Sequence, residues 1–544
     1  MTGPADKSII SQPLDAGDVH RLADGTPLGE APPQPARRDE EVDRRGAIVS
    51  GLTWGVMFQA IEVAMAFAAM LVLVRILPPV DYGRAATTAA VVGMLGILNA
   101  HLFIGHALQL PDGETPDWSQ HFAFAFYLQA GLALICNGAA GACWLIPAYR
   151  PIAKLLHLAS FGVLLDAANH LGATMLRRDL LLRRIKIISS IGIFVRIAMI
   201  VGLGVAGGRA YAIVFGNNVV AAMPFAVDLF VVRGWRPDRG WWKLPRWRTY
   251  RDAFTFGAQR AAGGVMGGLR DAAETAVLPA TLGFAGIGLM NRAQALYSAT
   301  LGRMTSVLAD TVYPFLPRES RNPGRYAQHA TLYLQVTLLI AIPGAIFVGE
   351  EGRVISRVLY GTKWIDADPL IWPGALIGFA GAVCTAASGI LLAAGSLRAC
   401  LLLDAAAFVS IGPSLWLAWA GSGLQAYAWA LAGGQILLAS VSLERAGRLL
   451  TSDWFAKTIV PPTVSAAVAL ATCEAVAWIV VGYRPAFQLV VMGASFLLVL
   501  TGVLRLAFAQ TLMTLLGRLP AGKRAQRLLG FSLTHASALA AAAE

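Results

Sequence analysis

Charged residues are scarce in this sequence. Only 14% of its 544 residues are Asp, Glu, Lys or Arg, whereas 56% are hydrophobic. A soluble globular domain carries about 25% charged residues, so the composition excludes a cytosolic enzyme, a secreted domain and a disordered scaffold. A mean hydropathy of +0.59 predicts instead a membrane protein that crosses the bilayer many times.

Catalytic and metal-binding motifs are also lacking. The sequence has no Gly-rich phosphate loop, no nucleophile motif and no long outer loop to hold a catalytic constellation. The five cysteines lie in apolar segments without the paired spacing of a metal site, and they imply no disulfide framework; they are Cys136, Cys143, Cys384, Cys400 and Cys473. We therefore expect no cofactor, no metal and no enzymatic activity.

The net charge of +12 does not indicate a nucleic-acid partner in so apolar a chain. Lys and Arg collect in the cytoplasmic loops of membrane proteins. With the N-terminus inside, the predicted cytoplasmic segments hold 29 of the 44 Lys and Arg residues, and the outer loops hold 9. This bias predicts that both termini are cytoplasmic.

Apolar stretches of about 20 residues, the length needed to cross a bilayer, recur fourteen times between the two polar ends. The predicted spans are residues 50–74, 85–109, 121–147, 153–176, 186–207, 210–232, 252–281, 285–315, 329–349, 368–394, 400–420, 424–443, 459–481 and 486–510. The sequence thus predicts an all-α integral membrane fold with fourteen transmembrane helices.

The predicted spans suggest how the chain is divided into domains. We predict two six-helix lobes, residues 46–232 and 252–443, joined by a basic cytoplasmic linker, residues 233–251. Residues 444–511 hold the last two helices. The two ends are expected to be tails: the proline-rich residues 1–45, disordered in the cytoplasm, and residues 512–544, interfacial or disordered.

An internal repeat supports the two lobes. Leu77–Gly83 after the first span and Leu282–Gly288 after the seventh both place Leu six residues before Gly, at an offset of 205 residues. Duplicated halves are common in transporters. Six helices in each half give both halves the same topological sense, so we expect them to be related by an axis along the membrane normal.

Four motifs carry a family resemblance. RILPPVDYG (Arg75–Gly83) resembles the R-hydrophobic-L-x-P-x-D-Y/F-G turn of the polysaccharide transporter family, the Wzx-type O-antigen and exopolysaccharide repeat-unit flippases of the MOP superfamily. Later motifs follow in the family's order: GLMNRAQAL (Gly288–Leu296) with VYPFLPR (Val312–Arg318), YGTKWIDADPLI (Tyr360–Ile371) and ILLAAGSLR (Ile390–Arg398).

The resemblance implies a MATE/MOP-like fold, in which a V-shaped pair of lobes surrounds a central cavity. It implies that undecaprenyl-diphosphate-linked oligosaccharide repeat units move from the inner to the outer leaflet of the bacterial cytoplasmic membrane by alternating access. Such transport serves lipopolysaccharide or exopolysaccharide biosynthesis. Expected partners are the lipid-linked oligosaccharide, membrane lipids and other polysaccharide-assembly proteins.

Other functions stay open. A lipid-linked peptidoglycan-precursor flippase also has fourteen helices. A drug or metabolite antiporter of the same superfamily would be favoured by an acidic lumen. A membrane polysaccharide polymerase, ligase or acyltransferase and a structural membrane scaffold are further alternatives.

Charges in the seventh span point to a transport path. An ionisable residue at the bilayer centre costs about 2.5–3.5 kcal/mol, so it usually faces a cavity or a partner. At about 100° per residue, Arg260, Asp271 and Glu274 share one helical face, and Arg270 lies at its margin. This face cannot contact lipid, and Asp271 and Glu274 are also candidates for ion or proton coupling.

The eighth span carries complementary charges. Arg292, Arg303 and Asp310 share one face. Because the seventh and eighth spans are antiparallel, Arg260 should match Asp310 in depth, and Glu274 should match Arg292. We interpret these as structural ion pairs.

Arg270 and Arg303 then lack an obvious partner across the two helices. They are our candidates for holding a diphosphate, because the guanidinium group has forked donors and a permanent charge. Structural pairing is the alternative for both, and for Arg270 the nearby Asp271 and Glu274 are the neighbours that would neutralise it.

Other intramembrane charges are further candidates. Glu62 either faces the cavity as a coupling group or bonds to a neighbouring helix, and Arg196 extends the cationic surface or is structural. Asp166 and His170, four residues apart, form either a proton relay or a structural pair between helices.

Overall fold

The computed structural model describes residues 61–62, 64–108, 115–243, 251, 254–255, 257–258, 261, 264–312, 316–509 and 513. All regular structure within these residues is helical. This confirms the predicted all-α fold.

The N-terminal half is built from long helices and two interrupted segments. Its elements are a helix at 64–76, α2 (Pro79–Gly96), α3 (Ala100–Ile104), η2 (Gly105–Leu108), α4 (Trp118–Leu145), α5 (Arg150–Arg178), α6 (Leu182–Val205), α7 (Arg209–Val214), η3 (Phe215–Val219), η4 (Val220–Ala222), α8 (Pro224–Val227) and η5 (Asp228–Val232). The run from α7 to η5 is one continuous span in which η3 and η5 are π-helical turns.

The C-terminal half follows the same pattern and adds two helices. Its elements are α10 (Val265–Thr281), α11 (Gly283–Tyr297), η6 (Ser298–Gly302), α12 (Arg303–Val312), α13 (Leu316–Glu319), α14 (Pro323–Leu359), η7 (Thr362–Leu370), α15 (Ile371–Ala393), α16 (Leu397–Ser410), α17 (Gly412–Trp419), α18 (Gly423–Gly447), α19 (Trp454–Thr458), α20 (Val460–Val480) and α21 (Pro485–Ala507). Here η6 is a π-helical turn between α11 and α12.

Local sequence explains where many of these helices begin and end. α2, α5, α14 and α21 each begin with proline in one of the first two positions, where the missing N–H costs no hydrogen bond. α15 and α17 are followed by Gly395 and Gly421, whose positive φ angles of 77° and 76° place them in the left-handed conformation that ends helices.

Ten of the described helices are long and apolar enough to cross a membrane, which makes the chain a multi-pass membrane protein. The predicted count of fourteen stays a prediction. The other four predicted spans are the first, second, seventh and eighth. In the described residues, the first span is the short helix 64–76, and the second is broken after α2. The seventh is the charged helix α10, and the eighth is interrupted by the π-helical turn η6.

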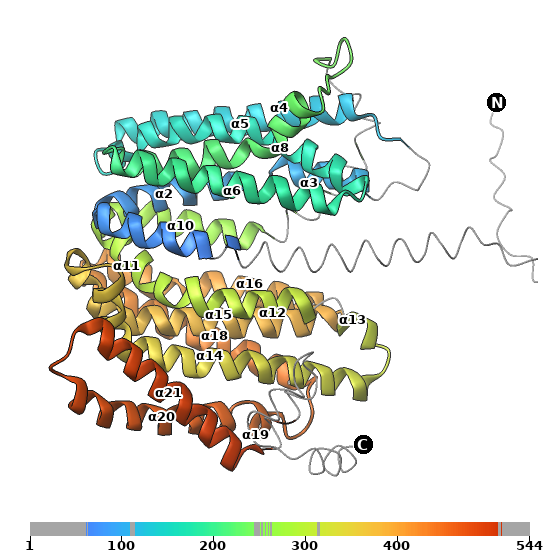
Figure 1. Ribbon diagram of the computed structural model, residues 1–544. Coiled ribbons are helices and arrows are strands. Elements are labelled where there is room, and N and C mark those ends of the chain that lie inside the picture. The colour runs from blue at the N-terminus through green and yellow to red at the C-terminus, as the bar shows by residue number, and fades with distance from the viewer. Residues whose placement is uncertain are drawn as a thin grey trace, which may run out of the picture. The chain divides into compact units, whose positions relative to one another are not determined.

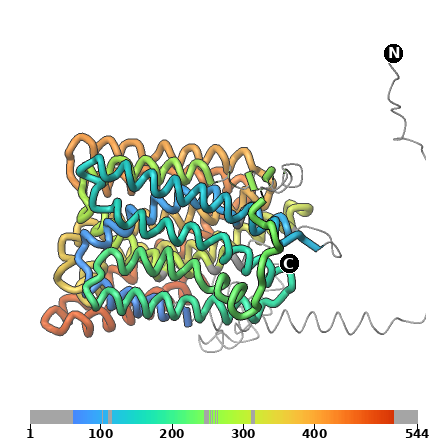
Figure 2. Tube along the Cα trace, turned by 90° about the horizontal axis from the view of Figure 1, so that it is seen from above, coloured from blue at the N-terminus to red at the C-terminus, as the bar shows by residue number. Residues whose placement is uncertain are grey.

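The helices of residues 56–544, one compact unit, run alongside one another (Figures 1 and 2). α4, α5, α6 and α8 form one group, and α14, α15 and α18 belong to another (Figure 1). α2, α10 and α11 lie between these groups, where both α10 and α11 contact α2. α20 and α21 lie at the edge, packed on each other and on α14.

Candidate functional site

α2 and α11 cross with their backbones in direct contact. A Cβ atom added to Gly83 would lie 1.7 Å from the carbonyl oxygen of Phe284, and one added to Gly288 would lie 1.9 Å from that of Pro79. Gly83 and Gly288 are the repeat-equivalent glycines, and Pro79 and Phe284 are also 205 residues apart. The crossing is therefore reciprocal, and it requires glycine on both helices.

Side chains tie the same end of the molecule together. The indole Nε1 of Trp364 donates to the carbonyl of Val74 at 2.9 Å, and Arg75 Nη2 donates to the carbonyl of Val358 at 2.8 Å. Lys363 Nζ completes the set by donating to the carbonyl of Arg75 at 3.1 Å. These bonds join the end of the helix at 64–76 to the end of α14 and to η7, at the end of the molecule that is predicted to face outward.

A further bond crosses between the halves at this end. The Tyr149 hydroxyl, in the turn between α4 and α5, donates to the carbonyl of Ala276 on α10 at 2.5 Å. Burial raises the pKa of the Tyr149 phenol, so this hydroxyl keeps the proton that it donates.

Arg292 lies at the same end of the molecule. Its guanidinium carbon lies 4.6 Å from the centre of the Tyr82 ring, and its Nη2 donates to Asn291 Oδ1 at 2.6 Å. The predicted Glu274–Arg292 ion pair is wrong. The glycine crossing brings α2 so close to α11 that Arg292 stacks on Tyr82 as a cation–π contact.

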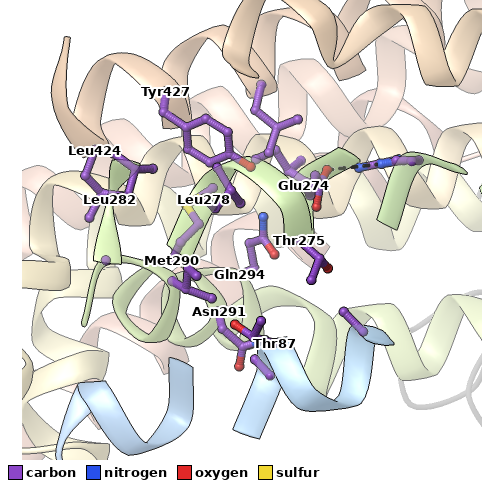
Figure 3. A pocket seen from close by; sticks show the side chains of 17 residues that line it. Thr87, Glu274, Thr275, Leu278, Leu282, Met290, Asn291, Gln294, Leu424 and Tyr427 are labelled. Carbon is purple, nitrogen blue, oxygen red and sulfur yellow. Dashed lines mark hydrogen bonds and ion pairs between the residues drawn. The ribbon is translucent and has the colours of Figure 1, made fainter. Parts of the chain in front are cut away.

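A cavity of about 240 Å³ lies between α2, α10, α11, α15 and α18. Polar residues from four of these helices line it: Thr87 from α2, Arg270, Glu274 and Thr275 from α10, Asn291 and Gln294 from α11, and Tyr427 from α18 (Figure 3). Leu278, Leu282, Leu424 and other apolar residues form the rest of its wall. This volume is below the roughly 300–1,000 Å³ of common ligand pockets, so the cavity holds only a small part of a large cargo.

Arg270 and Glu274 form an ion pair beside this cavity. Arg270 Nε lies 3.3 Å from Glu274 Oε1, and the two side chains are 29% and 25% exposed. This pair confirms the structural alternative for Arg270, since residues four apart on a helix face each other. Asp271, the next residue, is exposed.

Four uncharged cavity residues were not predicted from the sequence as site residues: Thr87, Asn291, Gln294 and Tyr427. Asn291 and Gln294 belong to the GLMNRAQAL motif, and two amides inside an apolar helix were an available signal. Thr87 and Tyr427 offered no such signal, because isolated hydroxyl residues are common in membrane helices.

Two further arginines, one from each half, lie outside the lining of this cavity. Arg196 on α6 lies within electrostatic range of Glu62 and of Arg303, the first residue of α12. Ser190 Oγ donates to Glu62 Oε1 at 3.0 Å, which confirms the hydrogen-bonded alternative for Glu62. Arg303 is exposed, and π-helical turn η6 separates it from Arg292.

The structure does not describe every residue that was predicted to line the transport path. Arg260 and the side chain of Asp310 lie outside the described residues, so their predicted pairing stays a prediction.

Two neighbouring glycines of α10 differ in their surroundings. A Cβ atom added to Gly268 would lie 1.9 Å from Cδ1 of Ile97, whereas a Cβ atom added to Gly267 would have no atom within 4 Å.

Asp228 has partners that the sequence did not reveal. Its Oδ1 lies 2.7 Å from Arg184 Nη2, and its Oδ2 lies 3.1 Å from Arg233 Nε. Asp166 and His170 lie 3.8 Å apart on the same helix, α5. Asp166 also hydrogen-bonds to Asn99, which lies between α2 and α3, so its contacts agree with the predicted structural alternative.

Comparisons with known proteins agree with this architecture. Residues 72–369, more than half of the chain, match the family described as polysaccharide biosynthesis protein. Among solved structures, the fold is similar to the lipid II flippase MurJ in an inward closed conformation (11% identity, 84% of this chain and 99% of that chain covered, TM-score 0.65). It is also similar to a multidrug resistance MATE family transporter of the MOP superfamily in its inward-facing conformation (16% identity, 71% and 95% covered, TM-score 0.54). A search of curated proteins finds no match.

The fold defines a multi-pass membrane protein of the architecture shared by MurJ and MATE transporters. The chain belongs to the polysaccharide biosynthesis protein family. The predicted family and fold class are thereby confirmed.

Proposed function

We propose that this chain moves undecaprenyl-diphosphate-linked oligosaccharide repeat units from the inner to the outer leaflet of the bacterial cytoplasmic membrane, for lipopolysaccharide or exopolysaccharide assembly. Both termini are cytoplasmic in this proposal. The observation that carries it is that Arg196 of one half and Arg303 of the other lie within electrostatic range of each other, in a member of a polysaccharide biosynthesis family.

Arginines suit a diphosphate because each guanidinium offers forked donors that match phosphate oxygens. Like charges on two halves repel each other, and an anion between them removes that repulsion. A diphosphate entering from the cytoplasmic side would therefore draw Arg196 and Arg303 together while the polyprenyl tail stays in lipid.

Release to the outer side requires the opposite end to open. The α2–α11 crossing and the bond from Trp364 to Val74 would have to separate, and the Arg270 cavity would then widen toward the outer leaflet. These steps move a cargo without making or breaking a covalent bond, so the proposal is a transporter and not an enzyme.

Deletion of the gene tests the cargo. We expect lipid-linked oligosaccharides to accumulate, and mass spectrometry of the lipid extract identifies their sugars and their diphosphate link. No accumulation, with intact export of every surface polysaccharide, would contradict the proposal.

Substitution of Arg303 tests the site in the complemented deletion strain. Arg303→Ala should abolish export, and Arg303→Lys should retain part of it, because lysine keeps the charge but loses the fork. Arg505→Ala on α21 is the control for loss of a cation away from the contact between the halves. Full export by Arg303→Ala at normal abundance removes Arg303 from the site.

A lipid-linked peptidoglycan precursor is the second candidate cargo. The fold similarity to MurJ over 84% of this chain favours it. Rescue of a strain depleted of its own lipid II flippase would support this cargo, whereas rescue of only the polysaccharide defect would exclude it.

A further inference from the structure

The turn between α5 and α6 has a conformation that its sequence does not favour. Leu180 has a positive φ angle of 55°, which a residue with a Cβ atom rarely adopts. The turn between α15 and α16 has the same pattern of backbone hydrogen bonds, in which residues 394–397 bond as residues 179–182 do. Its left-handed residue is Gly395, which adopts this conformation without strain. The N-terminal half therefore has a leucine where glycine is sufficient for the turn.

The strained leucine lies on an exposed apolar surface. Leu180 is 72% exposed, and Leu181 and Leu182 are exposed as well, so packing inside the protein does not offset the strain. An apolar turn bordered by cations suits a membrane surface, where leucines reach the acyl boundary and cations contact headgroup phosphates. Four arginines flank the three leucines: Arg177, Arg178, Arg183 and Arg184.

Ion pairs join this turn to the segment that follows η5. Asp179 Oδ2 lies 3.8 Å from Arg233 Nη1. Asp228 Oδ1 lies 2.7 Å from Arg184 Nη2, and Asp228 Oδ2 lies 3.1 Å from Arg233 Nε. The α5–α6 turn and residues 233–243 therefore lie side by side at one end of the N-terminal half.

Residues 233–243 are folded onto α4. The carboxylate of Asp238 accepts a hydrogen bond from Ser119 Oγ at 2.8 Å, and the Asp238 N–H donates to the same oxygen at 2.9 Å. The ring of Trp241 packs on that of Phe122, with 5.0 Å between their centroids. These contacts fix which side chains of the segment point away from the protein.

The exposed side chains of this segment match a negatively charged membrane surface. Trp242 is 61% exposed, and tryptophan is enriched at membrane–water interfaces. Residues 177–186 and 233–243 together contain nine Lys and Arg residues and two acids, and both acids already have partners within the protein. The excess of positive charge favours anionic over zwitterionic headgroups. The exposed cations of the second segment are Arg236, Arg239 and Lys243.

We propose that the surface formed by residues 177–186 and 233–243, here called the basic surface, binds anionic phospholipid headgroups. The three leucines contact the acyl boundary, Trp242 lies at headgroup level, and Arg239 and Lys243 contact the phosphates. α5 runs from the end where Tyr149 bonds to Ala276 to the basic surface. The basic surface therefore lies at the end predicted to be cytoplasmic, where the membrane surface is negative.

The first experiment titrates the purified full-length protein in detergent with phosphatidylglycerol and, separately, with zwitterionic phosphatidylcholine, and measures binding by native mass spectrometry. The wild type should bind phosphatidylglycerol more tightly. A cation near an anionic lipid surface contributes about fivefold to binding, so Arg239→Gln/Lys243→Gln should weaken phosphatidylglycerol binding about 25-fold. Binding of phosphatidylcholine should stay unchanged.

The matched control removes two cations from the other half. Arg398 and Arg445 are exposed and lie at the same end of the C-terminal half as the turn that contains Gly395. Arg398→Gln/Arg445→Gln should bind phosphatidylglycerol as the wild type does. Size exclusion checks that both double variants are folded.

A second experiment tests Leu180 by thermal unfolding in detergent, with and without phosphatidylglycerol. Leu180→Gly removes the left-handed strain, so its unfolding temperature without lipid should equal or exceed that of the wild type. Phosphatidylglycerol should raise the unfolding temperature of the wild type, and less that of Leu180→Gly. A purely structural leucine would instead give a lower unfolding temperature without lipid and an unchanged response to lipid. Leu397→Gly, in the equivalent turn of the C-terminal half, should keep the full response.

The proposal is overturned if the wild type binds both lipids equally, if Arg239→Gln/Lys243→Gln binds phosphatidylglycerol as tightly as the wild type, or if Leu180→Gly keeps the full response. Tighter binding of undecaprenyl diphosphate than of phosphatidylglycerol, lost in the same double variant, would assign the basic surface to the cargo and also overturn it. Because the two main experiments contain no cargo, their failure leaves the proposed flippase function unaffected.

Discussion

Two helix pairs of this protein contact each other in opposite ways. α2 and α11 meet backbone to backbone at Gly83 and Gly288. α20 and α21 pack through side chains, with Cys473 and Phe496 buried between them and α14. Trp478 of α20 is 86% exposed, as expected for a side chain that faces lipid.

The difference shows where the structure tolerates change. The α2–α11 crossing joins the two halves and leaves no room for a single added atom. The α20–α21 pair covers one edge and presents apolar side chains, which bilayer lipid accommodates without a specific partner. In the proposed transport cycle the α2–α11 contact is therefore the one that must separate, whereas α20 and α21 stay packed on α14.

Gly288→Val should have the largest effect. Its Cβ would overlap a backbone carbonyl that no rotamer change can move, and overpacking costs about 1–3 kcal/mol or more. We expect loss of export together with separation of the outer end, measured by cysteine labelling of residues near Trp364.

The matched control lies on the peripheral pair. Gly502 of α21 has nothing within 4 Å of an added Cβ, so Gly502→Val should leave export and labelling unchanged. Normal export by Gly288→Val at normal abundance would show that α2 and α11 need not touch.

The Arg270–Glu274 pair should give the next largest effect. Arg270→Ala leaves a half-buried carboxylate unpaired, and we expect a loss of about 2 kcal/mol in the free energy of unfolding, below the 3–5 kcal/mol of a fully buried pair. Arg270→Ala/Glu274→Ala should recover most of this stability. Export should stay low in the double variant, because the cavity still lacks its cation.

Thermal unfolding in detergent and export in the complemented strain provide the two measurements. Recovery of export in the double variant would assign Arg270 to structure alone.

Trp364→Phe should have a smaller effect on stability. It removes the Nε1 donor to Val74 and leaves a buried carbonyl without a partner, a loss of about 1 kcal/mol. The ring contact with Tyr82, 5.4 Å between centroids, is retained. We expect increased outer labelling relative to the wild type, and no change for Trp478→Phe on α20. Equal labelling of both variants would show that Trp364 does not hold together the end that is predicted to face outward.

The sequence predicted the helical segments well because membrane spans need long apolar runs. It also found the repeat through Gly83 and Gly288, since a tight contact needs glycine at fixed positions. It did not predict the interaction partners of Glu274 and Arg292 correctly. The pairing of Glu274 with Arg292 assumed two ideal antiparallel helices, whereas Arg292 instead stacks on Tyr82 of α2, a helix that the depth argument did not include. Residues such as Tyr427 join the cavity through tertiary packing, which no local pattern encodes.

The smallest effect is expected for the peripheral ion pair between Lys457 and Asp453, which has the same four-residue spacing as Arg270 and Glu274. Lys457 Nζ lies 2.5 Å from Asp453 Oδ2, and the side chains are 56% and 48% exposed. The hydrogen bond from Lys457 holds the pKa of Asp453 below its usual value. A carboxyl with a lowered pKa stabilises the fold above its unfolded pKa, near 3.8, and loses this contribution only as the pH falls through the folded value.

Lys457→Ala should therefore change stability by only about 0.3–0.5 kcal/mol at neutral pH, with no change in export and no pH dependence between pH 5 and pH 8. Thermal unfolding across that range measures this. A loss as large as that of Arg270→Ala would show that the edge formed by α19, α20 and α21 is as sensitive to substitution as the contact between the halves, and the contrast drawn from their packing would be wrong.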